Sequence, residues 1–115
     1  MSHSIEITPN PNRILVRWAG EVVADTTRAL NMKEASYPVV HYIPREDVAM
    51  DKLTGTAHQT HCPYKGDASY FSILAKGQTT ENAVWSYETP LPSVSAIAGY
   101  VAFYGSRVDG IEEIP

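Results

Sequence analysis

The chain has 115 residues, of which 43% are hydrophobic and 19% are charged, and its formal net charge is −4. This length suits one domain with a hydrophobic core, and the acidic balance with scattered lysines and arginines argues against nucleic-acid binding. No apolar run is long enough to cross a membrane, the N-terminus does not resemble a signal peptide, and Cys62 is the only cysteine. We therefore expect a cytoplasmic protein that binds neither nucleic acid nor membrane.

The first part of the chain predicts a lead-in followed by a hairpin. Residues 1–12 are polar and are interrupted by prolines, so we expect an irregular N-terminal lead-in to a single domain over residues 13–115. Hydrophobic residues alternate over 13–18, and a second β-rich run covers 21–25. The link Ala19-Gly20 between them is typical of a hairpin turn.

The rest of the chain continues this pattern of short strands and turns. Thr54-Gly55-Thr56 is expected to be a loop, and the segment Pro63 to Gly66 the turn of a central hairpin. Short helical segments are expected after Pro44 and from Pro92 to Gly99, each with proline at its start. Further strands are expected over 29–33, 39–43, 58–62, 68–74, 83–87, 100–104 and 107–111. This spacing predicts an all-β fold, a compact antiparallel β-sandwich or barrel with one or two short helical turns.

The segment THCPYKGDASY, residues 60–70, holds the densest group of reactive side chains. If 58–62 is a strand, His58 and Cys62 lie about 13 Å apart at ~3.3 Å per residue, and His61 faces the other side. One metal ion cannot bridge that distance, although zinc needs three or four ligands. No nucleotide-binding motif is present either, so we expect neither a metal nor a cofactor.

Two chemical interpretations of this segment remain open. In the first, the protein is an enzyme in which His61, Cys62 and Lys65 perform acid–base or covalent chemistry, with Lys65 providing the positive field that a thiolate needs. In the second, Cys62 is a small buried hydrophobic residue before a turn. The charged residues then only cap local structure and form ion pairs with one another. A rapid reaction of Cys62 with an alkylating reagent would favour the first.

Aromatic and cationic side chains also suggest a cleft for a small organic ligand, including organic anions. Aromatic rings supply contact area, and a lysine or arginine orients a carboxylate or phosphate. If the predicted strands are neighbours, the ligand-binding residues are Arg45, Tyr64, Lys65, Tyr70, Trp85 and Tyr87. The competing interpretation is that these aromatics fill the core. A third is a structural or protein-interaction module, most simply a homodimer.

Four ordered blocks resemble the DUF427 family: YIPREDV (42–48), THCPYKGDASY (60–70), NAVWSYE (82–88) and GYVAFY (99–104). The resemblance implies a compact β structure of the tent-like or Mss4-like kind and a biochemical function that is not settled. Two departures stand out, because family members often have I-K-G where this chain has IAG (97–99) and Pro-Asp where it has Gly105-Ser106.

The family is sometimes labelled nucleotidyltransferase-like. Such enzymes pair a Gly-Ser with two metal-binding carboxylates about ten residues later, since two Mg²⁺ ions clamp the transferred phosphate. Here Gly105-Ser106 is followed by Asp109 after only three residues, and no Asp-x-Asp occurs. The residues therefore argue against phosphoryl transfer.

Overall fold

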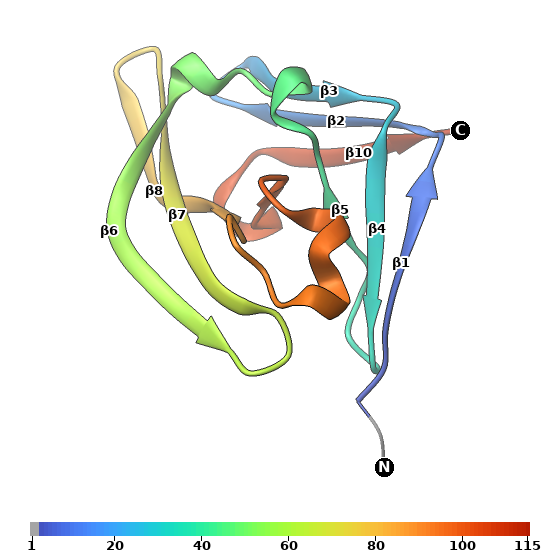
Figure 1. Cartoon of the computed structure of the whole chain (residues 1–115). Coiled ribbons are helices and arrows are strands. Elements are labelled where there is room, and N and C mark those ends of the chain that lie inside the picture. The colour runs from blue at the N-terminus through green and yellow to red at the C-terminus, as the bar shows by residue number, and fades with distance from the viewer. Residues whose placement is uncertain (1–2) are drawn as a thin grey trace.

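The computed structural model describes residues 3–115, which form three antiparallel sheets (Figure 1). The first sheet has the order β1-β4-β5, with β1 at Ile5–Asn10, β4 at Ala29–Glu34 and β5 at Val40–Tyr42. The second has the order β10-β2-β3, with β2 at Arg13–Trp18, β3 at Glu21–Thr26 and β10 at Gly110–Ile114. The third has the order β6-β7-β8-β9, with β6 at Leu53–Cys62, β7 at Gly66–Ala75, β8 at Gln78–Ser86 and β9 at Val101–Phe103.

The helical segments are short 3₁₀ turns, so the prediction of an all-β fold with short helical turns is confirmed. They are η1 (Arg45–Asp47), η2 (Met50–Lys52), η3 (Pro92–Ile97) and η4 (Gly105–Arg107). None of the helices in residues 3–115 is long enough to span a membrane. In Figure 1, β2, β3 and β10 cross the upper part of the molecule, β1 and β4 run in opposite directions on the right, and the antiparallel pair β6 and β7 curves along the left.

Two local expectations differ from the structure. Residues 5–10, expected to be irregular, form β1 and pair with β4. Ile5 and Ile7 alternate with exposed residues, and Pro9 is tolerated because β1 is the edge strand of its sheet. The loop predicted at Thr54-Gly55-Thr56 is wrong, because these residues belong to β6. The pairing with β7 shifts between Gly55 and Gln59, so glycine here marks an irregularity within a strand.

The hairpins were predicted well, and the last strand less so. β2 and β3 pair across Ala19-Gly20, and β6 and β7 pair on either side of the turn before Gly66. The final strand begins at Gly110 because residues 105–107 form η4. The strand predicted over 107–111 is therefore displaced toward the C-terminus.

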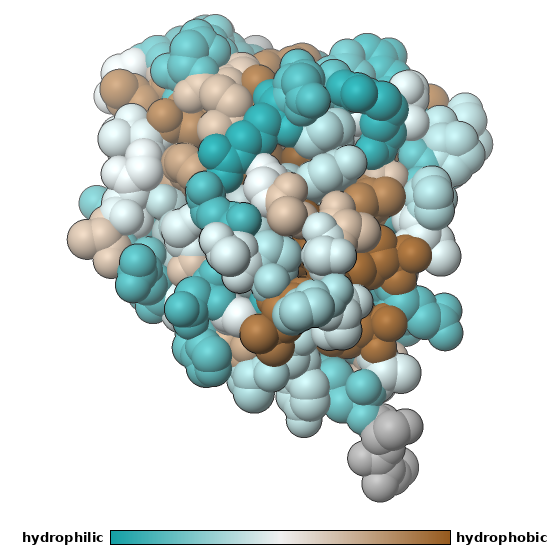
Figure 2. All heavy atoms as spheres, viewed as in Figure 1, coloured by the Kyte–Doolittle hydropathy of each residue, from teal (hydrophilic) through white to brown (hydrophobic). Residues whose placement is uncertain are grey.

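The buried hydrophobic side chains form two clusters. The first includes Ile14, Val23, Ile43, Val84 and Val101, and full burial of each such side chain contributes about 1.5–3 kcal/mol. The second cluster combines strands of the first and third sheets with η3, and its larger members are Met32, Tyr42, Tyr70, Tyr87, Val94 and Ile97. Figure 2 shows hydrophobic residues gathered at the surface on the side where β1 and β4 lie. The candidate site lies at the second cluster, whose members Met32, Tyr42, Tyr70 and Tyr87 line it.

Candidate functional site

A row of side chains across the third sheet forms one wall of the site. Tyr70 in β7 is the cross-strand partner of Trp85 in β8, and Trp85 in turn pairs with Ala102 in β9. Because the side chain of Ala102 is small, β9 leaves space beside the indole ring of Trp85. Tyr104 follows β9, with its ring centre 4.4 Å from that of Trp85 and 6.4 Å from that of Tyr70. The three rings form a continuous aromatic wall.

One side of this wall borders a partly polar cavity, the phenol pocket, of about 180 Å³. Four of the six predicted ligand-binding residues line it, together with Tyr42, Glu34 and Tyr104; the four are Lys65, Tyr70, Trp85 and Tyr87. These residues come from the β6–β7 turn and from two strands, and the fold brings them together. That they bind a ligand remains a prediction.

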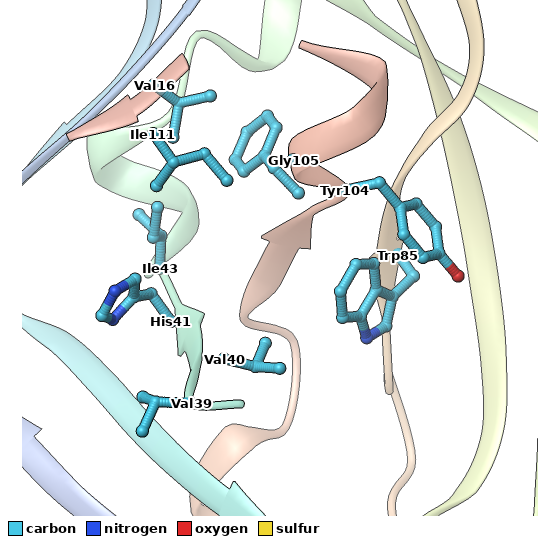
Figure 3. A pocket seen from close by; sticks show the side chains of 10 residues that line it. Val16, Val39, Val40, His41, Ile43, Trp85, Tyr104, Gly105 and Ile111 are labelled. Carbon is cyan, nitrogen blue, oxygen red and sulfur yellow. The ribbon is translucent and has the colours of Figure 1, made fainter. Parts of the chain in front are cut away.

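The other side of the wall borders a second cavity, the apolar pocket, of about 260 Å³. It is lined mainly by aliphatic and aromatic side chains, among them Val16, Ile43, Phe103 and Ile111. In Figure 3, Trp85 and Tyr104 face this space from one side, while Val39, His41 and Ile43 lie on the opposite side. Val40, Trp85 and Tyr104 border both pockets.

The charged end of the phenol pocket is an ion pair between Lys65 and Glu34, with 12% and 15% of their side chains exposed. His3 Nε2 approaches the same carboxylate at 2.7 Å. Burial raises the pKa of Glu34, but the hydrogen bonds of Lys65 and His3 outweigh this effect, and the pKa lies below its ordinary value. The ammonium of Lys65 also lies 5.9 Å from the ring centre of Tyr87.

Gly66 positions Lys65. It has φ +109°, and an added Cβ would lie 3.5 Å from Leu91 N and 3.6 Å from Pro90 Cα. Leu91 N donates a hydrogen bond to the Lys65 carbonyl at 2.9 Å, so the turn lies directly against residues 90–91. Glycine is favoured here because residues with a Cβ rarely adopt this φ, whereas the contacts of an added Cβ would be ordinary ones.

The phenols around the pocket differ in their hydrogen bonds. Trp85 Nε1 donates to Tyr42 Oη at 3.2 Å, and Tyr70 Oη lies 2.9 Å from Thr60 Oγ1 and 3.3 Å from Tyr104 Oη. Tyr87 is only 6% exposed, yet its hydroxyl makes no hydrogen bond with residues 3–115. Every fully buried side-chain oxygen or nitrogen in that range has a partner, so the Tyr87 oxygen reaches the open space of the pocket.

Burial raises the pKa of three of the tyrosines at the pocket. It raises the pKa of Tyr42 to about 12, although the hydrogen bond from Trp85 opposes the shift. Burial likewise raises the pKa of Tyr87 and raises the pKa of Tyr104 to about 12. Tyr42, Tyr87 and Tyr104 therefore stay protonated over the whole physiological pH range.

Arg45 and Tyr64 lie outside the phenol pocket. Arg45 Nε donates to Gly99 O at 2.6 Å, and its Nη2 donates to Ser86 Oγ at 3.2 Å and to Glu88 Oε1 at 2.6 Å. Ser86 alternates with Trp85 and Tyr87 along the chain, so Arg45 lies on the opposite face. Tyr64 stacks on the ring of His3, with centres 3.8 Å apart, and is exposed.

The three candidate catalytic residues have separate partners. His61 Nδ1 lies 2.7 Å from Asp67 Oδ1 at an exposed position. Cys62 is half-buried against the second cluster, and Lys65 pairs with Glu34. Among residues 3–115, no group of three His, Cys, Asp or Glu side chains is arranged to hold a metal ion.

Sequence reasoning missed three residues of the site. Tyr42 and Tyr104 lie in the blocks 42–48 and 99–104, but the contact of their strands with β8 depends on the order of the third sheet and on the Ile43–Val101 bridge. Glu34 ends β4 and meets Lys65 from a different sheet. No local pattern in the sequence indicates these contacts.

Fold and pocket define a small all-β domain with an aromatic cavity between its sheets. The chain belongs to the family described as Domain of unknown function (DUF427), whose family model matches residues 6–114. No curated protein matches the chain. At the two positions where this sequence departs from the family pattern, Ala98 is exposed after η3 and Gly105 borders the apolar pocket.

Proposed function

We propose that the protein binds a small organic ligand in the phenol pocket. The observation that carries this proposal is the Tyr87 hydroxyl, which opens into this cavity and has no hydrogen-bond partner in residues 3–115. A ligand acceptor beside it would gain one hydrogen bond, worth about 0.5–1.5 kcal/mol.

The other residues of the pocket support the same proposal. Trp85, Tyr70 and Tyr42 supply ring surfaces around the open space, a composition that is typical of ligand cavities. Lys65 and Glu34 add one charge of each sign at the edge. The covalent alternative that uses His61, Cys62 and Lys65 is less well supported, because these side chains have separate partners.

Native mass spectrometry of freshly purified protein tests the proposal. We expect an extra mass on the folded protein that is lost on denaturation, and a lower occupancy in Trp85→Ala than in the wild type. Tyr64→Ala is the matched control, because it removes an exposed aromatic ring outside the pocket. Equal occupancy in both variants, or a bare wild-type protein, would contradict the proposal.

A second candidate is self-association through β6. This strand forms the edge of the third sheet, and eight of its ten residues are exposed. Unpaired backbone groups on a long edge strand can pair with the same strand of another copy. Light scattering should then report a dimer, and Gln59→Pro should convert it to a monomer; a wild-type monomer at high concentration would exclude this interface.

We also propose a reducing, cytoplasmic setting for the protein. Support comes from the composition, because Cys62 is the only cysteine of the chain. Fractionation of the cells that make it, followed by immunodetection, would test this, and recovery outside the cytoplasm would contradict it.

A further inference from the structure

We infer that the phenol pocket and the apolar pocket are two arms of one site whose ligand is amphipathic. Its hydrocarbon end occupies the apolar pocket, and its uncharged hydrogen-bond acceptor, a carbonyl oxygen as in an amide or ketone, meets the phenols. This inference rests on the proposed function and names the class of ligand.

The two pockets share a border. Val40, Trp85 and Tyr104 line both, so a ligand beside the indole contacts the two arms at once. With volumes of about 180 and 260 Å³, each arm is smaller than the ~300 Å³ at which ligand pockets typically begin. Only the two arms together reach the size of an ordinary ligand site.

The apolar arm offers a ligand almost nothing to hydrogen-bond. Its one titratable side chain besides Tyr104 is His41, whose Nδ1 is already 2.7 Å from Asn31 Oδ1 and whose Nε2 lies 3.7 Å from Glu113. The remaining lining is mainly aliphatic and aromatic. A hydrocarbon chain or ring is the group that gains free energy by leaving water for this space.

Exposed hydrophobic residues also surround the openings of the two arms. Four of the large exposed hydrophobic side chains border one arm or both: Tyr37, Val39, Tyr104 and Ile111. Hydrophobic residues that cluster at the surface around a cavity usually mark a place where something binds. A ligand that lies across both arms would cover them.

The phenol arm favours an uncharged acceptor over an anion. The Tyr87 hydroxyl has no partner in residues 3–115, and Tyr42 Oη accepts a hydrogen bond from Trp85, which leaves its own proton to donate. The positive charge of Lys65 is already paired with Glu34. A carboxylate would have to displace Glu34 or lie beside it, whereas a carbonyl needs only the phenol protons.

Calorimetric titration with butanamide, hexanamide, octanamide and octanoate tests this class of ligand. We expect affinity for the amides to rise about fourfold for each added CH₂ group, from ~0.8 kcal/mol per methylene, until the apolar arm is full. Octanoate should bind at least about tenfold more weakly than octanamide because of Glu34. Tighter binding of octanoate, or no binding by any amide, would overturn the inference.

Two matched substitutions in β10 test the apolar arm. Ile111 and Ile114 are exposed to the same extent, 38% and 39%, but only Ile111 borders the arm. Ile111→Lys should abolish the gain in affinity with chain length, and Ile114→Lys should preserve it. If both variants keep that gain, the apolar arm is not part of the site.

Tyr87→Phe separates this inference from the proposed function. Loss of one hydrogen bond should weaken every amide by about two- to tenfold, whatever its chain length. If Tyr87→Phe weakens binding while Ile111→Lys has no effect, the ligand occupies the phenol pocket alone and the inference fails while the proposed function stands. If neither substitution changes binding of the amides, both fail for this class of ligand.

Discussion

Lys65 and Glu34, 31 residues apart in the chain, form an ion pair at the wall of the phenol pocket. The pair joins the β6–β7 turn to the end of β4, and so connects the first sheet to the third. His3 shares the carboxylate from the N-terminal side. This contact both shapes the pocket and contributes to the stability of the fold.

The Glu34 carboxylate predicts a loss of stability in acid. Its pKa is lower in the folded protein than in the unfolded chain, so its contribution is complete above the unfolded value of about 4.3 and is lost as the pH falls through the folded value. In chemical denaturation, Glu34→Gln should lower the free energy of unfolding near neutral pH by about 1–3 kcal/mol. As the pH is lowered further, the free energy of unfolding of Glu34→Gln should fall less than that of the wild type.

Asp25→Asn is the control for this pH series. Asp25 has a lowered pKa too, caused mainly by its hydrogen bond from Arg13, but the pair is exposed. Added salt should therefore suppress the effect of Asp25→Asn and leave that of Glu34→Gln. Equal salt dependence of the two variants would show that the Lys65–Glu34 pair is solvated like a surface ion pair.

The hydroxyl of Tyr87 should contribute nothing to the stability of the unliganded protein. Tyr87→Phe is expected to leave the free energy of unfolding unchanged or slightly higher, because no hydrogen bond with residues 3–115 is lost. Tyr70→Phe is the matched comparison and should cost about 0.5–1.5 kcal/mol, since Tyr70 Oη contacts both Thr60 and Tyr104. Denaturant unfolding of both variants measures the difference, and an equal cost would contradict the assignment of Tyr87 as unpaired.

The glycine after Lys65 should disfavour a side chain because of its backbone conformation. Gly66→Ala requires alanine at φ +109°, although its Cβ would make only ordinary contacts with residues 90–91, so we expect a loss of about 1–3 kcal/mol. Gly77→Ala has φ +73° with nothing within 4 Å of the added Cβ, and should cost about 1–2 kcal/mol at most. In thermal unfolding, the melting temperature of Gly66→Ala should be lower than that of Gly77→Ala, and the reverse order would show that φ +109° is not strained for alanine in this turn.

Cys62 should react slowly with iodoacetamide near neutral pH. The side chain is half-buried and packs against the second cluster, which restricts access of the reagent. Intact-mass measurements over time should show much slower labelling of the folded protein than of the protein in denaturant. Comparable rates would revive the hypothesis of a nucleophilic thiolate.

Much of the local structure follows from the sequence because it depends on neighbours in the chain. The alternation over 13–18 and the Ala19-Gly20 link correctly predicted the first hairpin. The segment Pro63 to Gly66 correctly predicted the turn of the central hairpin. The same argument placed Trp85 and Tyr87 on one face, and in the structure both line the phenol pocket, Trp85 from β8 and Tyr87 from the residue after it. Where an element departed from local pattern, as at Gly55 in β6, the loop prediction was wrong.

The order of the sheets could not be predicted in this way, and it decides which residues form the site. Tyr42 meets Trp85, Tyr104 meets Tyr70, and Glu34 meets Lys65 only because separate strands are brought together by the packing of two hydrophobic clusters. Arg45 illustrates the reverse, since its place in the sequence suggested the cleft and the fold turned it toward Glu88. The sequence by itself determined the strands, the turns and the chemical character of the central segment, because these depend on backbone preferences and on residues a few positions apart. Tertiary structure alone decided which side chains border the cavity and which hydroxyl has no partner in residues 3–115, because those depend on packing between residues tens of positions apart.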